Sequence, residues 1–585
     1  MASTEPGGWL LAPVDEAGLP AAPPRPARDL AALAAVVREA AEQGRSGEDT
    51  GGAASAGAVR WVWADTSSVY PALLAAGARV ERCHDAALTE ALLLGHEGRW
   101  GQPRSLAAAW ARLTGGEVPA DADPLLPLGH RQGPGDEGNG VQDALFGPDD
   151  LPSGAAASRL PTGVDPLDAL VAVHRDQQRR VGVARAVSPG FGLLVAAESA
   201  AGLAAVEMGA AGLPWRADLH DAVLVEALGP RPAHGGRPTV LRMLAEEIAA
   251  LLADPRLNPD SQPEVLRALR RSGVIVSSTR RHELRKVDHP AVEPLLRYKE
   301  LARLHAANGW AWRDQWVRDG RFRPEYVPGG VVSGRWASRG GGALQIPRAV
   351  RSAVVADPGH VLVVADAGQL EPRVLAALSG DAGMVAATRA GDLYAEIAAQ
   401  ALGRPEARAE AKLALLSAMY GGGAGSAAPA LAALRRRFPA ALAVLEDAAR
   451  TGEDGGVVRS VLGRTSPAAR PGWLDGLTDE AAGARARARG RFTRNFVVQA
   501  SAADWAGVLV AGLRTRLARL GGGGRPELVF FQHDEVVLHV PRALADATVA
   551  AVTVAGVEAT RLVLPGQAVT VPLDAVVVES YADKP

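Results

Sequence analysis

Three carboxylates lie at the ends of apolar segments in the second half of the chain. Asp534 and Glu535 stand in the stretch FFQHDEVVLHV, between two apolar runs that predict strands, and Asp366 follows the apolar run Val361–Ala365. Adjacent carboxylates repel each other unless a positive charge lies beside them. Because Mg²⁺ prefers a few carboxylate oxygens together with substrate phosphates, the three acids could share magnesium ions. The alternative is structural, since an acid such as Asp366 at a strand end can simply cap a turn.

A second set of side chains recurs every four positions. Arg408, Lys412, Leu416 and Tyr420 lie in RPEARAEAKLALLSAMYGGG, a segment with proline suited to a first helical turn and Gly421 as its stop. Each step of four residues rotates the helix by about 40°, so the four side chains form one drifting stripe. Its two cations would meet a triphosphate, and its leucine and tyrosine could pack a sugar and a base. The alternative is an amphipathic surface helix with solvated cations.

The elements that must hold these side chains are a buried sheet and the helices that follow its strands. Val361–Ala365, in which four of the five residues are Val or Leu, is a predicted central strand that ends at Asp366. Pro372 suits the first turn of a helix, so Asp366 and Glu371 are expected at a strand-to-helix junction. The predicted fold class is a multidomain α/β protein.

The composition limits the possible partners. The 585 residues carry 63 basic and 65 acidic side chains, a formal net charge of −2, so a polyanion must be met by local patches. The stretch Arg267–Lys286 is one such patch, unless it is a solvated helical hairpin. The single cysteine, Cys83, excludes an internal disulfide framework and favours a reducing compartment. The sequence shows no signal-peptide pattern and no uninterrupted apolar run of about 18 residues, which predicts no membrane span.

Lysine is scarce in a chain whose cations are mostly arginines. It occurs only at Lys286, Lys299, Lys412 and Lys584. An ammonium is a compact point charge and differs from the planar fork of a guanidinium. Each of the four lysines is therefore a candidate for a specific contact.

Three stretches in this order resemble motifs A, B and C of the family-A DNA polymerases, the group of bacterial DNA polymerase I. DAGQLEPR at 366–373 is similar to D-Y-S-Q-I-E-L-R, the Arg408–Gly421 pattern is similar to R-x₃-K-x₇-Y-G, and HDE at 533–535 is similar to V-H-D-E. Three supporting segments also resemble family motifs: SGRWASRGGGALQIPR at 333–348, GVVRSVLGR at 456–464 and RFTRNFVVQASAAD at 491–504. The resemblance covers roughly residues 200 to 585.

The resemblance implies a right-hand polymerase, with a palm built on an antiparallel sheet and with helical fingers and thumb. It implies an N-terminal domain at 1–200, a mainly helical connector and thumb at 201–330, and palm and fingers at 331–585, with the fingers at about 385–490. The implied partners are primer-template DNA and deoxynucleoside triphosphates. A monomer located in the cytoplasm, associated with the nucleoid of a bacterium, is expected.

The resemblance also implies roles for individual residues. Asp366 and Asp534 would bind two Mg²⁺ ions, for which Mn²⁺ could substitute. The implied catalytic residues are Asp366, Asp534, Glu535 and Lys412. The implied nucleotide-binding residues are Arg408, Lys412, Leu416, Tyr420, Glu371 and Gln369. The implied DNA-binding residues are Arg335, Gln345, Arg491, Asn495, Gln499 and His533, with Arg270 and Arg271 in the thumb.

The N-terminal third departs furthest from the family. The segment beginning WVWADTSS resembles part of a proofreading 3′–5′ exonuclease domain of RNase H-like fold, and Asp65 matches the acid of its second motif. The first motif, D-x-E on a strand, has no counterpart. Such a nuclease needs about four carboxylates around two metals. A degenerate exonuclease-like domain without proofreading is therefore expected, in which Asp65 and Asp85 are structural and the Gly/Pro-rich residues near 98–165 form a loop or linker.

The sequence thus predicts a template-directed DNA polymerase that extends a primer in replication or repair. Two alternatives remain. The first is a non-catalytic or weakly active DNA-binding repair or scaffold protein, supported by Ala367 and Gly368 in place of the usual Tyr-Ser of motif A. The second is an exonuclease that carries a polymerase-like body.

Overall fold

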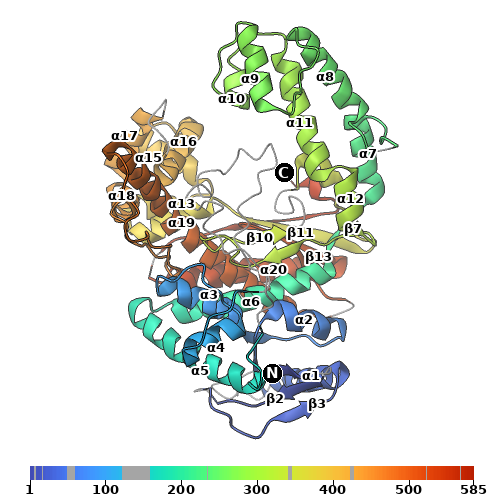
Figure 1. The fold of residues 1–585 in the computed structure, drawn as a ribbon, viewed down its shortest axis with the longest axis vertical. Coiled ribbons are helices and arrows are strands. Elements are labelled where there is room, and N and C mark those ends of the chain that lie inside the picture. The colour runs from blue at the N-terminus through green and yellow to red at the C-terminus, as the bar shows by residue number, and fades with distance from the viewer. Residues whose placement is uncertain are drawn as a thin grey trace.

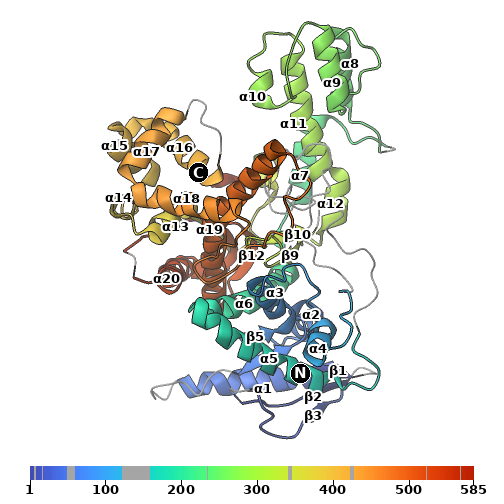
Figure 2. The same ribbon diagram turned by 60° about the vertical axis from the view of Figure 1, so that its left-hand side comes forward.

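The computed structural model describes residues 1–4, 8–15, 18–48, 59–121, 159–233, 235–339, 346–421, 427–521, 524–566 and 568–584. The chain forms an N-terminal domain at one end, a central sheet with its covering helices, and two helical arms on the other side of the sheet (Figure 1). The two arms stand apart above the sheet, and this separation is also visible after rotation (Figure 2).

The central sheet is antiparallel and has the order β12-β13-β11-β14. Its strands are β12 (Glu527–Gln532), β13 (Glu535–Pro541), β11 (His360–Ala367) and β14 (Leu573–Val578). The stretch Val361–Ala365 is buried throughout, which confirms the predicted central strand. Helices α20 (Ala545–Val563) and α6 (Phe191–Ala211) pack against the sheet. The two strands predicted around HDE are confirmed.

The first helical arm follows β11. It consists of α13 (Leu370–Ser379), α14 (Ala382–Ala387), α15 (Leu393–Leu402), α16 (Arg408–Tyr420), α17 (Ala428–Arg437) and α18 (Pro439–Glu453). Gly421 ends α16 with a left-handed φ of 70°, as its sequence predicts. Helix α19 (Asp479–Leu517) begins beside α18 and continues beneath the sheet, so it connects this arm to the core (Figure 2).

The second helical arm precedes β11. It contains α7 (Ala217–Leu228), α8 (Thr239–Leu251), α9 (Gln262–Arg271), the short α10 (Arg281–Leu284), α11 (Val292–Asn308) and α12 (Trp310–Trp316). Its base is an aromatic cluster in which the ring centroid of Trp312 lies 5.4 Å from Trp215 and 4.9 Å from Phe322. Short strands complete this base and the link to the sheet: β6 (Leu213–Pro214), β7 (Val317–Arg318), β8 (Arg321–Phe322), β9 (Glu325–Val327) and β10 (Ala337–Arg339).

The N-terminal domain begins with three short strands that the sequence did not predict. Antiparallel β1 (Ala2–Thr4), β2 (Gly8–Leu11) and β3 (Arg25–Ala27) precede α1 (Leu30–Glu48), and β4 (Arg60–Trp63) pairs in parallel with β5 (Arg82–Asp85). The amino group of Met1 donates to the carbonyl of Val62 at 3.0 Å, which ties the start of the chain to β4. The strands form two sheets, one with the order β1-β2-β3 and one made of β4 and β5. Helices α2 (Thr66–Ala75), α3 (Ala86–His96), α4 (Leu106–Thr114) and α5 (Pro166–Val187) complete the domain.

Helix α4 lies within the range near 98–165 that the sequence predicts to be loop or linker, so that prediction is wrong for Leu106–Thr114. Alanines occupy its buried face, with Ser105 as N-cap and Gly115 as the left-handed C-cap. Residues 122–158 of the same range lie outside the described part of the chain.

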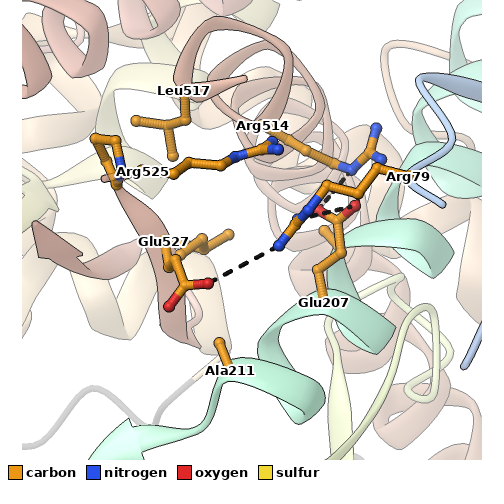
Figure 3. A pocket seen from close by; sticks show the side chains of 10 residues that line it. Arg79, Glu207, Ala211, Arg514, Leu517, Arg525 and Glu527 are labelled. Atoms are coloured by element: carbon orange, nitrogen blue, oxygen red, sulfur yellow. Dashed lines mark hydrogen bonds and ion pairs between the residues drawn. The ribbon is translucent and has the colours of Figure 1, made fainter. Parts of the chain in front are cut away.

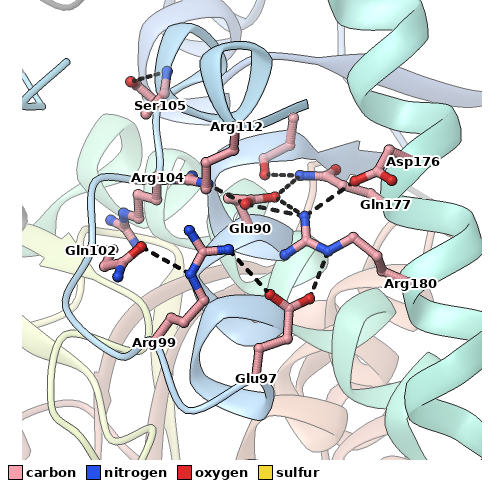
Figure 4. A network of polar contacts seen from close by, with 12 residues as sticks. Glu90, Glu97, Arg99, Gln102, Arg104, Ser105, Arg112, Asp176, Gln177 and Arg180 are labelled. Carbon is pink, nitrogen blue, oxygen red and sulfur yellow. Dashed lines mark hydrogen bonds and ion pairs between the residues drawn. The ribbon is translucent and has the colours of Figure 1, made fainter. Parts of the chain in front are cut away.

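A buried ionic network fastens α3, α4 and α5 together (Figure 4). The carboxylate of Glu90 in α3 accepts hydrogen bonds from Arg112 at 3.1 Å, from Arg180 at 2.9 Å and from Gln177 at 3.0 Å. The Glu90 side chain has no exposed surface, so its charge is tolerated only because these donors surround it.

A second buried network joins the N-terminal domain to the core (Figure 3). Arg514 of α19 donates to Glu207 of α6 at 2.9 Å and to the carbonyl of Glu81 at 2.8 Å. Helix α6 packs against both α2 of the N-terminal domain and α19 of the core. The expected domain boundary at 200/201 falls inside this helix, so the two regions share it as a common element.

Three helical stretches in the described part of the chain are long and apolar enough to cross a membrane by length and composition alone. They are α6, α19 and Arg542–Val563, with 67%, 72% and 28% of their apolar windows buried. Each contains polar or charged residues, so none is an uninterrupted apolar run. In this fold, the apolar surface of α6 and α19 packs in the core.

Candidate active site

The site is built where β11 ends. Asp366 stands directly opposite Glu535 of β13 and, on the other side, opposite Asp574 of β14. Directly opposed residues of antiparallel strands project from the same face with Cβ atoms about 5 Å apart. The backbone of Asp534 is fixed there too, because its carbonyl accepts a 3.1 Å hydrogen bond from the amide of Ala367. The strand register thus brings together acids that lie far apart in the sequence.

Residues His533 and Asp534 form the two-residue turn between β12 and β13. His533 has φ of 56°, in the left-handed region, where a hairpin of this length usually has glycine. Gln369, at the start of α13, has a similar φ of 57°. Left-handed conformations of non-glycine residues are costly and are often found at functional sites. Two such residues flank the carboxylates.

The surroundings of Asp534 are unfavourable for negative charge. Burial, together with the charge of Asp366, raises the pKa of Asp534 to about 7. Burial and the neighbouring Arg335 lower the pKa of His533 to about 4, so its imidazole is neutral at neutral pH. The site therefore gains stability from any cation that approaches the acids.

Glu535 points to groups other than Asp534. Its carboxylate accepts a hydrogen bond from the hydroxyl of Tyr581 and an ion pair from Lys584. The same Lys584 ammonium lies 3.2 Å from Asp366 Oδ2. Although burial opposes its charge, the hydrogen bond to Glu535 raises the pKa of Lys584. Among the residues that the structure describes, no group of three or more His, Cys, Asp or Glu side chains is arranged to hold a metal ion.

The carboxylates do fit a hard divalent cation that takes further ligands from a substrate. Asp366 and Asp534 offer oxygen donors only, and they are close enough for one charge to shift the pKa of the other. Mg²⁺ is usually bound by one or two carboxylates plus waters and substrate phosphates, and does not need a complete protein cage. These two residues would hold the ion, with Glu535 behind them.

Glu371 is the centre of a polar cluster beside the carboxylates. Its side chain accepts a hydrogen bond from the hydroxyl of Tyr420 at 2.8 Å and an ion pair from Arg335. Burial and the charge of Glu371 raise the pKa of Tyr420 to about 12, so the phenol stays protonated. The cluster connects the start of α13 to the end of α16.

Helix α16 presents the predicted stripe on its unburied face. Arg408, Lys412 and Tyr420 are exposed and Leu416 is half-buried, whereas Ala411, Ala414, Leu415, Ala418 and Met419 are buried. Arg408 forms an ion pair with Asp392. The guanidinium of Arg408 lies 5.7 Å, and the ammonium of Lys412 5.8 Å, from the ring centroid of Tyr394. The stripe therefore has its cations at one end and contacts the Glu371 cluster at the other.

Gln369, which is expected to bind the nucleotide, makes two hydrogen bonds within the protein. Its amide donates to Asp392 at 3.0 Å and accepts from the backbone of Leu393 at 2.8 Å. These bonds tie the start of α13 to the start of α15. Gln369 thus positions neighbouring elements in this structure.

The described DNA-binding candidates fall in three places: Arg335 and His533 beside the carboxylates, and the others on α19 and α9. Arg491, Asn495 and Gln499 lie on successive turns of α19, and Gln499 hydrogen-bonds to Tyr420 at the end of the stripe. Arg270 and Arg271 are exposed on α9, where Arg271 forms an ion pair with Asp254. Helix α9 lies high on the second arm, far along the molecule from the sheet (Figure 1). Gln345 lies outside the described residues.

Sequence reasoning missed several residues of the site. Asp574, Asp392, Tyr394 and Tyr581 carried no motif signal. The scarcity of lysine did single out Lys584 as a candidate for a specific contact, but not the site that it joins. Its contacts with Asp366 and Glu535 depend on the packing of the segment that follows β14, which no local pattern encodes.

The comparisons with known proteins agree with this geometry. The family model described as DNA polymerase family A matches residues 264–579, more than half of the chain. The thermostable DNA polymerase I of Thermus filiformis is 31% identical over 283 residues, which are 44% of this chain and 33% of that protein. DNA polymerase I of Chloroflexus aurantiacus is 29% identical over 311 residues, 49% of this chain and 32% of that protein. The chain thus spans about a third of the length of these curated relatives.

A solved structure extends the similarity of the fold to nearly the whole chain. The POL domain of Pol1 from M. smegmatis, in complex with DNA primer-template and dNTP, matches with a TM-score of 0.68 and 20% identity. The match covers 96% of this chain and 91% of that one. The family predicted from the sequence motifs is confirmed, and this chain belongs to DNA polymerase family A.

Proposed function

We propose that this chain is a template-directed DNA polymerase that adds deoxynucleoside triphosphates to a primer 3′ end. The observation that carries the proposal is the register of the central sheet, which sets Asp366 beside Asp534 and Glu535. This acidic edge lies next to the Glu371 cluster, to which α16 is bonded through Tyr420. Family membership supports the reaction class, and the M. smegmatis relative was solved with primer-template and dNTP.

The cations of α16 are suited to a triphosphate. Lys412 is exposed and Arg408 is bonded to a single carboxylate, Asp392, so both can exchange their present contacts for phosphate oxygens. Preorganised cations stabilise the negative charge that develops on a leaving pyrophosphate. Leu416 lies between these cations and Tyr420, where it would pack against the sugar of the nucleotide.

Asp366 and Asp534 would hold two magnesium ions at the reacting end of the nucleotide. When bound, such ions lower the pKa of the attacking primer hydroxyl and neutralise the leaving phosphates. The chain itself keeps the two carboxylates at a fixed separation through the β11–β13 pairing. Glu371, fixed by Arg335 and Tyr420, would occupy the space beside the sugar and so disfavour a 2′-hydroxyl.

We further propose that the N-terminal domain has no proofreading activity. Asp65 and Asp85 both serve as helix N-caps: Asp65 accepts from the amide of Ser67 at 2.8 Å, and Asp85 from the amide of Leu88 at 2.8 Å. Asp85 also accepts from the amide of Thr66 at 2.8 Å. These two acids are already committed to backbone contacts.

A DNA-binding scaffold remains the second candidate, because Lys584 binds the acidic edge in this structure. A primer-extension assay with Mg²⁺, run with and without nucleotides, separates the candidates. Lengthening of the primer supports the polymerase, an unchanged primer supports the scaffold, and shortening without nucleotides supports an exonuclease. An unchanged or shortened primer in the presence of all four nucleotides would refute the proposed function.

A further inference from the structure

Lys584 makes two contacts that the proposed reaction does not use. Its ammonium forms an ion pair with Glu535 and lies 3.2 Å from Asp366 Oδ2. Only 19% of its side chain is exposed. Lys584 also lies beyond residues 264–579, the part of the chain that the family model matches. The cation therefore belongs to the acidic edge of the sheet but not to the motifs that define the family.

The turn that carries Lys584 is anchored to the core. Tyr581 is 1% exposed, and its hydroxyl donates to Glu535. Its backbone amide donates to the carbonyl of Val354 at 2.9 Å, and the guanidinium of Arg351 lies 4.5 Å from the centroid of its ring. Ser580 and Asp583 form a capping box around the short helix Tyr581–Asp583. The contacts of the neighbouring residues therefore fix the backbone position of Lys584.

A lysine at this position offers one charge to oxygens that would otherwise bind a divalent ion. An ammonium is a compact charge on a flexible four-carbon stem, so it can leave the carboxylates without moving the backbone. A divalent ion and the ammonium cannot both lie against the same oxygen of Asp366. While Lys584 stays, it also weakens the attraction of the site for any second cation.

We propose that Lys584 is an internal counter-cation that occupies the acidic edge in the metal-free protein and must be displaced when a divalent ion binds, so that it sets the affinity of the site for the ion. This inference depends on the proposed function, because it assumes that Asp366 and Asp534 are the metal ligands. It makes Lys584 a positioning residue, whose removal tightens metal binding in the absence of DNA and nucleotide.

The test is a Mn²⁺ titration of the purified chain, followed by electron paramagnetic resonance at about pH 8, where most Asp and Glu side chains are ionised. The Mn²⁺ site of interest is the one that is lost in Asp534→Asn. Lys584→Met and Lys584→Gln are both expected to lower its dissociation constant about tenfold, equivalent to about 1.4 kcal/mol. Lys584→Arg keeps the charge and should leave the constant close to that of the parent. Arg542→Gln is the matched control, because Arg542 forms an exposed ion pair with Glu579 at the opposite end of β13. This variant should leave the Mn²⁺ dissociation constant unchanged.

The outcomes separate the inference from the proposed function. If Asp534→Asn leaves all Mn²⁺ binding intact, the assignment of the metal ligands fails, and the inference fails with it. If Asp534→Asn removes a site whose affinity is unchanged or weakened in Lys584→Met and Lys584→Gln, only the counter-cation role is refuted. Equal tightening in Lys584→Arg would refute it as well, because the effect would then not follow the charge.

Discussion

Replacing Asp534 with asparagine should stabilise the metal-free protein at high pH. Burial and Asp366 raise the pKa of Asp534 from 3.8 to about 7 in the folded chain. The native state therefore binds this proton more tightly than the unfolded state does, and stability is lost as the pH rises from about 4 to about 7. Three pKa units correspond to about 4 kcal/mol. Because the Asp534 side chain is only half-buried, solvent screening reduces the expected gain to about 2 kcal/mol.

Hydrogen exchange of β11 and β13 in EDTA measures this gain as the opening free energy of the two strands. A local measurement is suitable because a multidomain chain need not unfold in a single step. At about pH 8, the opening free energy of these strands should be higher in Asp534→Asn than in the parent, and the difference should shrink toward about pH 4. Asp447→Asn is the control, since Asp447 is an exposed acid on α18 and should change stability by less than about 0.5 kcal/mol. A difference that is absent at high pH, or that does not depend on pH, would show that neither burial nor the charge of Asp366 penalises the ionised form of Asp534.

Three further predictions follow from particular contacts. Arg514→Met should destabilise the joint between the N-terminal domain and the core by about 3 kcal/mol, because Glu207 stays buried with only Tyr70 and the more distant Arg79, at 3.6 Å, as partners. Thermal unfolding measures this loss, and equal losses in Arg514→Met and in Arg514→Met combined with Glu207→Gln would contradict the ion-pair explanation. The N-terminal domain should lose stability as the pH falls below about 6.5. Burial lowers the pKa of His84 to about 3 and of His174 to about 4, so at lower pH the unfolded chain binds more protons than the folded domain does. Hydrogen exchange of β5 and α5 that does not change between about pH 7 and about pH 5 would contradict this. Leu416 offers no ring to stack on the sugar, so dideoxynucleotides should be incorporated more slowly than deoxynucleotides in single-turnover assays, and equal rates would refute this role.

The sequence was most informative where function and local pattern coincide. The helix that carries Arg408 and Lys412 was predictable from its proline start and glycine stop, and the strand that ends at Asp366 from its apolar run. The hairpin was also predictable, although its turn consists of His533 and Asp534, with Glu535 already in β13. In these places the side-chain spacing directly determines which face of an element is buried.

Other parts could not be predicted, because they depend on pairings between distant segments. Strands β1, β2 and β3 are only three or four residues long, too short for a periodic signal. Asp574 and Lys584 join the site only because β14 pairs with β11 and because Tyr581 anchors the following turn to the core. Gln369 carried a family motif, but its observed hydrogen bonds connect α13 to α15.

Single-turnover incorporation of one complementary nucleotide tests the central claim most directly. The parent chain should extend a primer in the presence of Mg²⁺, whereas Asp534→Ala should not, although fluorescence anisotropy should show that it still binds the primer-template with similar affinity. Incorporation by Asp534→Ala at the parent rate would contradict the claim that this carboxylate holds the ions at which the new bond is made.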